Sequence, residues 1–252
     1  MAFYDLSAEE RKRHVEKISR EMLADIEKGG TKKILRYFSD SDTYIRKSAY
    51  IAAGRIYSAH PALRKKIIRL LGELLQSDDF YIRQTAVNAA GEIAMKDFGA
   101  VEKFFDNSLF DPHHSVRNAV IGSIKKSGRK NPRPVLAWAK KFLHHPDKEV
   151  RREICHGIEL RGRTHPQEIL PLLAELQFDT TARVKNTLVH VIGQISYKKN
   201  CLPVVIPALS KWKNRELVAK AIEEIIDVHD RYRNFSALTQ KEAIDFIHKN
   251  LV

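Results

Sequence analysis

The stretch SDTYIRKSA at residues 41–49 decides the fold, because its Ile45-Arg46 pair recurs along the chain. A branched apolar residue followed by a basic residue returns at Ile82-Arg83, Val116-Arg117, Val150-Arg151 and Val184-Lys185. The basic residues are separated by 37, 34, 34 and 34 positions, and a further 34 positions lead to Ala219, which follows Val218. A fixed period of this length is typical of solenoids, in which each repeat is one supersecondary unit stacked on the next.

The residues around each pair follow helical spacing. Counted from the basic residue, positions −1, +3, +6, +7 and +10 are mostly apolar or small, and in the first full repeat they are Ile45, Ala49, Ala52, Ala53 and Ile56. This spacing predicts one stripe of an amphipathic α-helix, here called the B helix. A second apolar stretch before each B helix, for example at 67–75, 135–143 and 169–176, predicts an A helix. The repeat is therefore an A helix, a short turn and a B helix.

Three residue types mark the boundaries of these helices. An aspartate stands four positions before the basic residue at Asp42, Asp79 and Asp147, where it can cap the B helix. A glycine at position +8, in Gly54, Gly91 and Gly193, is interpreted as the exit from the B helix. A proline at position +15, in Pro61, Pro132 and Pro166, suits the first turn of the next A helix.

The two ends of the chain differ from the repeats, as capping elements do. Ser7 to Glu10 and Thr239 to Glu242 both match a capping box, and each precedes an apolar helical stripe. We therefore predict an N-terminal capping helix in 1–30, repeats over 31–230 and a C-terminal capping helix in 231–252, all in one continuous solenoid. The predicted fold is an all-α, right-handed superhelix of about six helix pairs.

Residues 41–54 and 77–91 resemble HEAT repeats of the short bacterial kind, and the resemblance covers roughly residues 31–230. In HEAT repeats the recurring Asp and Arg typically bond between neighbouring repeats. The resemblance thus implies a structural role for Arg46, Arg83, Arg117 and Arg151. It also implies that the B helices line a concave face.

Residues 79–142 show a second resemblance, to the HEAT-like alkylpurine DNA glycosylases. That family grips duplex DNA in the concave groove, and it implies aromatic residues and an essential acidic residue there. The B helix that begins at Val116 instead carries Asn118, Ile121, Gly122 and Ser123. Trp138 and Trp212 fall on predicted A helices, where burial explains them.

Composition narrows the class of partner. The 252 residues carry a net charge of +13, with a pI near 9.7, which favours an anionic macromolecule. Cys155 and Cys201 are the only cysteines, and the N-terminus turns charged within a few residues, so we expect a cytoplasmic protein. No apolar run approaches the roughly 18 residues of a membrane span, and we expect a monomer that does not engage membranes.

The candidate contacts come from two surfaces. Position +1 of the B helices contains no acid and reads Lys47, Gln84, Asn118, Arg152, Asn186 and Lys220. Position +5 reads Ile51, Asn88, Gly122, His156, His190 and Glu224. The densest basic segment, at 125–133, contributes Lys125, Lys126, Arg129, Lys130 and Arg133 at a turn between repeats. We predict that Lys47, Arg152, Lys220 and this segment contact phosphate oxygens or acidic side chains.

Signals for other chemistry are weak. His113-His114 and His144-His145 occupy different positions of the repeat, and no His, Cys and carboxylate set has zinc spacing, so we predict no metal and no cofactor. The sequence has no phosphate-binding glycine loop and no Gly-x-Ser-x-Gly or His-Glu-x-x-His motif. We predict a non-catalytic binding module for duplex nucleic acid. The alternatives are a protein–protein adaptor and, third, a DNA-repair glycosylase.

Overall fold

A computed structural model describes residues 3–251, and all regular secondary structure in this range is helical. This confirms the predicted all-α helical-repeat fold. Packing divides the chain into two compact units, Met1–Asn131 and Pro132–Val252. That the repeats continue through both units as one solenoid stays a prediction.

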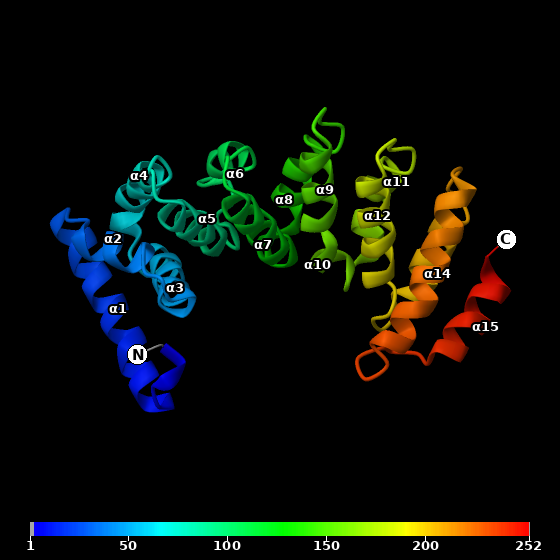
Figure 1. Cartoon of the computed structure of the whole chain (residues 1–252), viewed down its shortest axis with the longest axis horizontal. Helices are drawn as coiled ribbons and strands as arrows, with labels where there is room; N and C mark the ends of the chain where they lie inside the picture. The colour runs from blue at the N-terminus through cyan, green and yellow to red at the C-terminus, as the bar shows by residue number, and fades with distance from the viewer. Residues whose placement is uncertain (1–2, 252) are drawn as a thin grey trace. The chain divides into compact units, whose positions relative to one another are not determined.

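The first unit consists of a capping helix and three helix pairs (Figure 1). The capping helix is α1 (Ala8–Lys28), and the pairs are α2 (Lys32–Phe38) with α3 (Thr43–Ala59), α4 (Arg64–Leu74) with α5 (Phe80–Ala94), and α6 (Glu102–Ser108) with α7 (His114–Lys130). Short 3₁₀ segments lie at Phe3–Asp5 and Pro61–Leu63. The B helices α3, α5 and α7 pack side by side in one layer, and each A helix packs against its own B helix.

The second unit also consists of three helix pairs and a capping helix, but here the capping helix follows the pairs. Its pairs are α8 (Pro132–Lys140) with α9 (Lys148–Gly157), α11 (Pro166–Ala174) with α12 (Ala182–Gln194), and α13 (Leu202–Leu209) with α14 (Arg215–Arg231), followed by the capping helix α15 (Gln240–Asn250). A single extra turn, α10 (Glu159–Gly162), follows α9. The B helices α9, α12 and α14 again pack side by side.

The predicted helix starts are confirmed. Asp42, Asp79 and Asp147 each accept a hydrogen bond from the backbone N–H two residues later, and Ser7 and Thr239 each complete a capping box. Pro61, Pro132 and Pro166 stand at helix starts. Each cap satisfies backbone groups that have no partner within the helix.

The interpretation of the glycine column as helix exits is wrong for Gly54 and incomplete for Gly91 and Gly193. Gly54 lies in the interior of α3, which continues to Ala59, whereas Gly91 and Gly193 lie in the last turn of α5 and α12. A Cβ at each position would collide with the next B helix, at Glu92, Ser123 and Glu224 respectively. At position +8 the next B helix therefore lies too close for a side chain, and glycine permits that approach.

The core follows the predicted stripes. Ala49, Ala86 and Leu188, all at position +3, are completely buried, and each A helix buries part of its apolar face, including Ile67, Val135 and Ile169. Trp138 is buried on α8, and Trp212 is buried in the turn after α13, so both tryptophans serve packing. None of the described helices combines the length and apolar character needed to cross a membrane.

Candidate functional site

The ladder arginines connect consecutive repeats. Arg83 forms a two-pronged ion pair with Asp111, with Nε and Nη2 at 2.8 and 3.0 Å from its carboxylate oxygens. Arg151 pairs in the same way with Asp179, at 2.6 and 3.3 Å. Each guanidinium also donates to two carbonyls of its own A–B turn. These contacts confirm the structural role implied by the HEAT resemblance.

Arg46 and Arg117 bind their own turns in the same manner. Arg46 donates to the carbonyls of Asp40 and Ser41, and its guanidinium lies 4.3 Å from the centre of the Tyr81 ring in the next repeat. Arg117 donates to the carbonyl of Asp111 at 2.6 Å. The ladder side chains are thus engaged within the fold, and ligand contacts must come from other positions.

A groove of about 1010 Å³ crosses the C-terminal halves of α3, α5 and α7 in the first unit. We call it the basic groove. Its charged lining residues are five cations and one carboxylate: Arg55, Lys96, Lys126, Arg129, Lys130 and Glu92. The uncharged lining comprises Ile51, Gly54, Ser58, Ala59 and Met95. Three members of the predicted basic segment therefore share one surface with Arg55 on α3 and Lys96 in the turn after α5.

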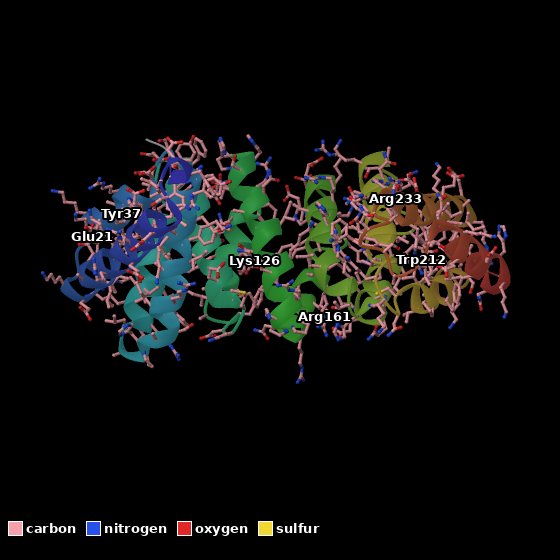
Figure 2. All side chains as sticks on the ribbon, turned by 90° about the horizontal axis from the view of Figure 1, so that it is seen from below. Glu21, Tyr37, Lys126, Arg161, Trp212 and Arg233 are labelled. Carbon is pink, nitrogen blue, oxygen red and sulfur yellow. The ribbon has the colours of Figure 1, made fainter. Side chains whose placement is uncertain are left out.

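Lys126 is the most constrained cation of the basic groove (labelled in Figure 2). Its Nζ lies 3.0 Å from the Glu92 carboxylate and 5.3 Å from the centre of the Tyr50 ring. Burial is the largest single influence and by itself would lower the pKa of Lys126, but the hydrogen bond to Glu92 and the interactions with Tyr50 and Glu92 together hold the pKa above its usual value. Lys126 thus stays charged and neutralises the groove's carboxylate.

The other predicted contacts of the first unit lie apart from this lining. Lys47 lines a separate cavity of about 190 Å³ formed by residues of α3, among them Tyr44 and Tyr50, and residues of α5, among them Gln84. Lys125 is on α7 but outside the lining of the basic groove. Arg133 lies on α8, and so belongs to the second unit.

The predicted cations of the second unit are accompanied by carboxylates. Arg152 pairs with Glu149 at 3.0 Å and with Glu153 at 3.5 Å, and Lys220 pairs with Glu216 at 2.7 Å. A cavity of about 580 Å³ along α12 and α14 has two cations and three carboxylates in its lining: Lys220, Arg231, Glu223, Glu224 and Asp227. This surface is mixed in charge, unlike the basic groove.

The structure brings together residues that sequence reasoning missed. Arg55 and Lys96 join the basic groove from positions 71 and 30 residues before Lys126. In the second unit, His156, Glu159 and His190 place their ligand atoms within 4.8 Å of one another. The sequence does indicate that the two histidines lie close together, because both stand at position +5 of consecutive repeats.

The cysteines are unsuited to nucleophilic chemistry. Cys155 and Cys201 are both buried, and burial raises the pKa of each thiol above its usual value. The reactive thiolate is therefore disfavoured at neutral pH.

The chain matches no protein-family model and no curated protein sequence. Among solved structures, AlkD2 from Streptococcus mutans is 19% identical over 81% of this chain and 97% of its own, with a TM-score of 0.56. The YibA protein of Escherichia coli is 19% identical, covering 84% of this chain and 76% of its own, with a TM-score of 0.45. A designed armadillo repeat protein for modular peptide recognition is 18% identical over 77% of this chain and 97% of its own, with a TM-score of 0.36.

These helical-repeat structures agree with both resemblances drawn from the sequence, to HEAT repeats and to the HEAT-like alkylpurine DNA glycosylases. Both resemblances are therefore confirmed at the level of the fold. At 19% identity this likeness concerns the arrangement of helices, and the activity of the chain has to be argued from its own side chains.

Proposed function

We propose that this chain is a binding module that holds the phosphate backbone of duplex nucleic acid in the basic groove. The observation that carries the proposal is the charge of its lining, with five cations against one carboxylate that is already paired. Binding there would release counterions from the nucleic acid, which drives association without sequence readout.

The placement of the cations supports a strand-like ligand. They come from α3, from Lys96 two residues after the end of α5, and from α7, and these three successive B helices pack side by side. Neighbouring packed helices lie about 8–10 Å apart, so cations on three of them span a distance of several nucleotides. A small anion would engage a fraction of this surface.

Helix dipoles account for only part of the charge. The groove lies at the C-terminal ends of three helices, and each end carries a partial charge of roughly −0.5, or about −1.5 in all. The lining has a net charge of +4, because five cations face one carboxylate. An excess of about +2.5 remains for an external anion.

The glycosylase alternative requires a carboxylate beside aromatic rings. Glu92 lies near Tyr50, but Lys126 contacts both and neutralises the carboxylate. This arrangement favours binding over base excision. Incubation with alkylated duplex DNA tests the alternative directly, since release of a free purine base would reveal an enzyme.

We expect the Arg129→Gln/Lys130→Gln double variant to weaken duplex binding to a similar extent for two unrelated sequences. Both residues are exposed in the last turn of α7. Removing two phosphate contacts should make the slope of log K against log salt less steep by about 2. Fluorescence anisotropy with a labelled duplex, between low and physiological salt, measures both effects.

The matched control is Arg69→Gln/Lys103→Gln. It removes the same charge from exposed positions on the A helices α4 and α6 of the same unit. Its salt slope should equal that of the unchanged chain. A chain that fails to bind duplex DNA at low ionic strength, or a control that loses as much affinity as the groove variant, would contradict the proposal.

The second candidate function is that of a protein–protein adaptor. The mixed lining of Glu223, Glu224, Asp227, Lys220 and Arg231 in the second unit favours a partner with both signs of charge. Competition separates the two functions. An acidic polypeptide that displaces the duplex only at large excess supports nucleic acid, whereas tight binding of the polypeptide with no duplex binding supports the adaptor.

A further inference from the structure

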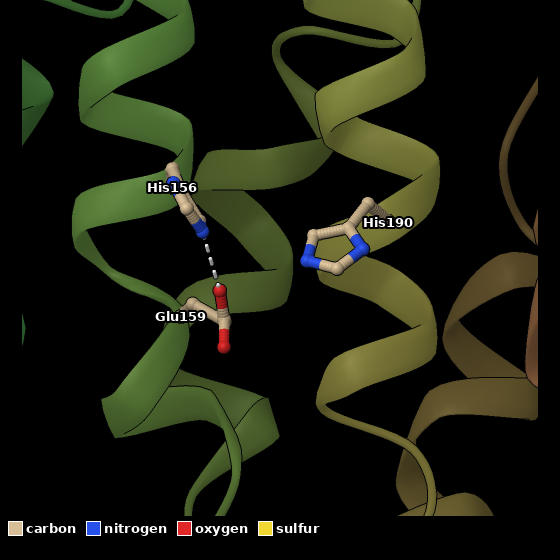
Figure 3. A group of neighbouring side chains, drawn as sticks. All are labelled: His156, Glu159 and His190. Atoms are coloured by element: carbon tan, nitrogen blue, oxygen red, sulfur yellow. Dashed lines mark ion pairs between the residues drawn. The ribbon is translucent and has the colours of Figure 1, made fainter. Parts of the chain in front are cut away.

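Three side chains with metal-binding atoms meet in the second unit (Figure 3). His156 comes from α9, Glu159 from α10 and His190 from α12. Both imidazole rings are directed toward the Glu159 carboxylate, and one ligand atom from each residue lies within 4.8 Å of the other two.

The repeat explains why the histidines converge. His156 and His190 both stand at position +5, and the B helices that carry them pack side by side. Equivalent positions on neighbouring B helices face each other. The two histidines 34 residues apart are thus held across one helix–helix interface.

Glu159 occupies position +8, where three other repeats have glycine. A side chain there would collide with the next B helix in a regular repeat, as it would at Gly193. The helix is interrupted at this point: α9 ends at Gly157, and α10 begins at Glu159. This interruption accommodates a buried carboxylate with only 2% of its side chain exposed.

The two oxygens of Glu159 have different surroundings. Oε1 accepts a hydrogen bond from Arg163 at 2.6 Å, and Arg163 also donates to Gln194 at 2.5 Å. Oε2 lies 3.0 Å from Nε2 of His156. The arginine fixes the orientation of the carboxylate, as outer-shell partners do in metal sites, and leaves Oε2 directed at the histidines.

We propose that His156, Glu159 and His190 form a zinc site. Imidazole nitrogen and carboxylate oxygen are ligands that Zn²⁺ accepts, and three protein ligands leave a fourth tetrahedral position for water. A cavity of about 340 Å³ lined by both histidines gives solvent access to that position. Tetrahedral ligands lie roughly 3.3–3.5 Å apart, so metal binding requires the partly exposed His190 side chain, whose Nδ1 lies 3.8 Å from Glu224, to turn toward Glu159.

Zinc binding is tested on the full, tag-free chain after equilibration with Zn²⁺ and removal of weakly bound metal by gel filtration. We expect one zinc per chain by elemental analysis. His156→Ala and His190→Ala should each lose it, with affinity reduced by more than the roughly 10–100-fold caused by loss of an outer-shell partner. His248→Ala, a change of the same kind at an exposed position on α15, should keep one zinc.

Two further measurements distinguish the loss of a zinc ligand from misfolding of the variant. Circular dichroism of each variant must match the unchanged chain, and His190→Asn offers a milder change at the exposed ligand. Cobalt(II) should give the intense visible absorption of tetrahedral coordination in the unchanged chain and in His248→Ala, but not in the ligand variants. A chain that takes up no zinc, or ligand variants that are folded and keep one zinc, would overturn the proposal.

Discussion

Replacing Asp179 with alanine is expected to lower the free energy of unfolding of the second unit by about 3 kcal/mol. The Arg151–Asp179 pair is nearly buried, with side chains 13% and 4% exposed, and removal of the carboxylate leaves an uncompensated cation. Loss of one partner from a buried pair costs roughly 3–5 kcal/mol. We expect the lower end, because Arg151 still donates to the carbonyls of His145 and Pro146.

Tryptophan fluorescence during urea unfolding isolates this effect. Trp138 and Trp212 are the only tryptophans, and both belong to the second unit. Asp230→Ala is the control, because it removes an exposed carboxylate paired with Arg233, and it should change stability by less than about 1 kcal/mol. Equal losses in the two variants would show that the Arg151–Asp179 pair does not hold the repeats together.

The Arg151–Asp179 pair makes the stability of the second unit depend on pH. Burial raises the pKa of Asp179, but hydrogen bonds from Arg151 and Thr181 outweigh it, so the pKa lies below its usual value. A carboxyl whose folded pKa is depressed stabilises the protein above the unfolded pKa of about 3.9, and this contribution is lost as the pH falls through the folded pKa. The gap in stability between the unchanged chain and Asp179→Ala should therefore be constant near neutral pH and shrink below about pH 4.

Replacing Gly91 with alanine is expected to destabilise the first unit by about 1–3 kcal/mol, although alanine is the better helix former. The new Cβ would collide with the Ser123 side chain and lie 3.1 Å from the Ser123 Cα on α7. Ser123 also donates a hydrogen bond to the carbonyl of Val87, so it cannot move without losing a buried contact. Circular dichroism during urea unfolding measures the loss.

Gly122→Ala is the matched comparison on the neighbouring helix. Gly122 is exposed within α7, and an added Cβ would meet nothing within 4 Å. Here alanine should stabilise the helix by roughly 0.5–1 kcal/mol. The two substitutions should therefore have opposite signs. If both stabilise the protein, close approach of the B helices is not the reason for glycine at position +8.

Local features were predicted correctly from the sequence because they act over a few residues. A cap at Asp79 needs only the backbone N–H of Tyr81, and the capping box at Ser7 spans four residues. The apolar stripe likewise depends on the helical period alone. The sequence alone therefore predicts the helix pairs, the residues at which they start and most of the core.

Contacts between repeats were harder to predict. The structural role of Arg83 was implied by its recurrence, but its partner Asp111 stands at a position of the next repeat that the period did not mark. The glycine at +8 was interpreted as the exit from the B helix, whereas the close approach of the neighbouring helix requires glycine there. Sequence spacing gives the identity of a repeat position, and packing decides what that position touches.

The candidate site divides in the same way. Lys126, Arg129 and Lys130 were predicted as a run of charge, but only the packing of α3 and α5 against α7 adds Arg55 and Lys96 and turns the run into a groove. Lys47, Arg152 and Lys220 share position +1, yet their surroundings differ, because neighbouring carboxylates pair with Arg152 and Lys220.

The sequence by itself determined that this protein is a helical repeat with capped helices and a large excess of positive charge, since period, caps and composition are properties of the chain. Only the tertiary structure decided where charge of one sign accumulates and which side chains meet across the B helices, as His156, Glu159 and His190 do. The physical reason is distance. Electrostatic and coordination interactions act over a few ångströms in space, and residues tens of positions apart come within that range only when the helices pack.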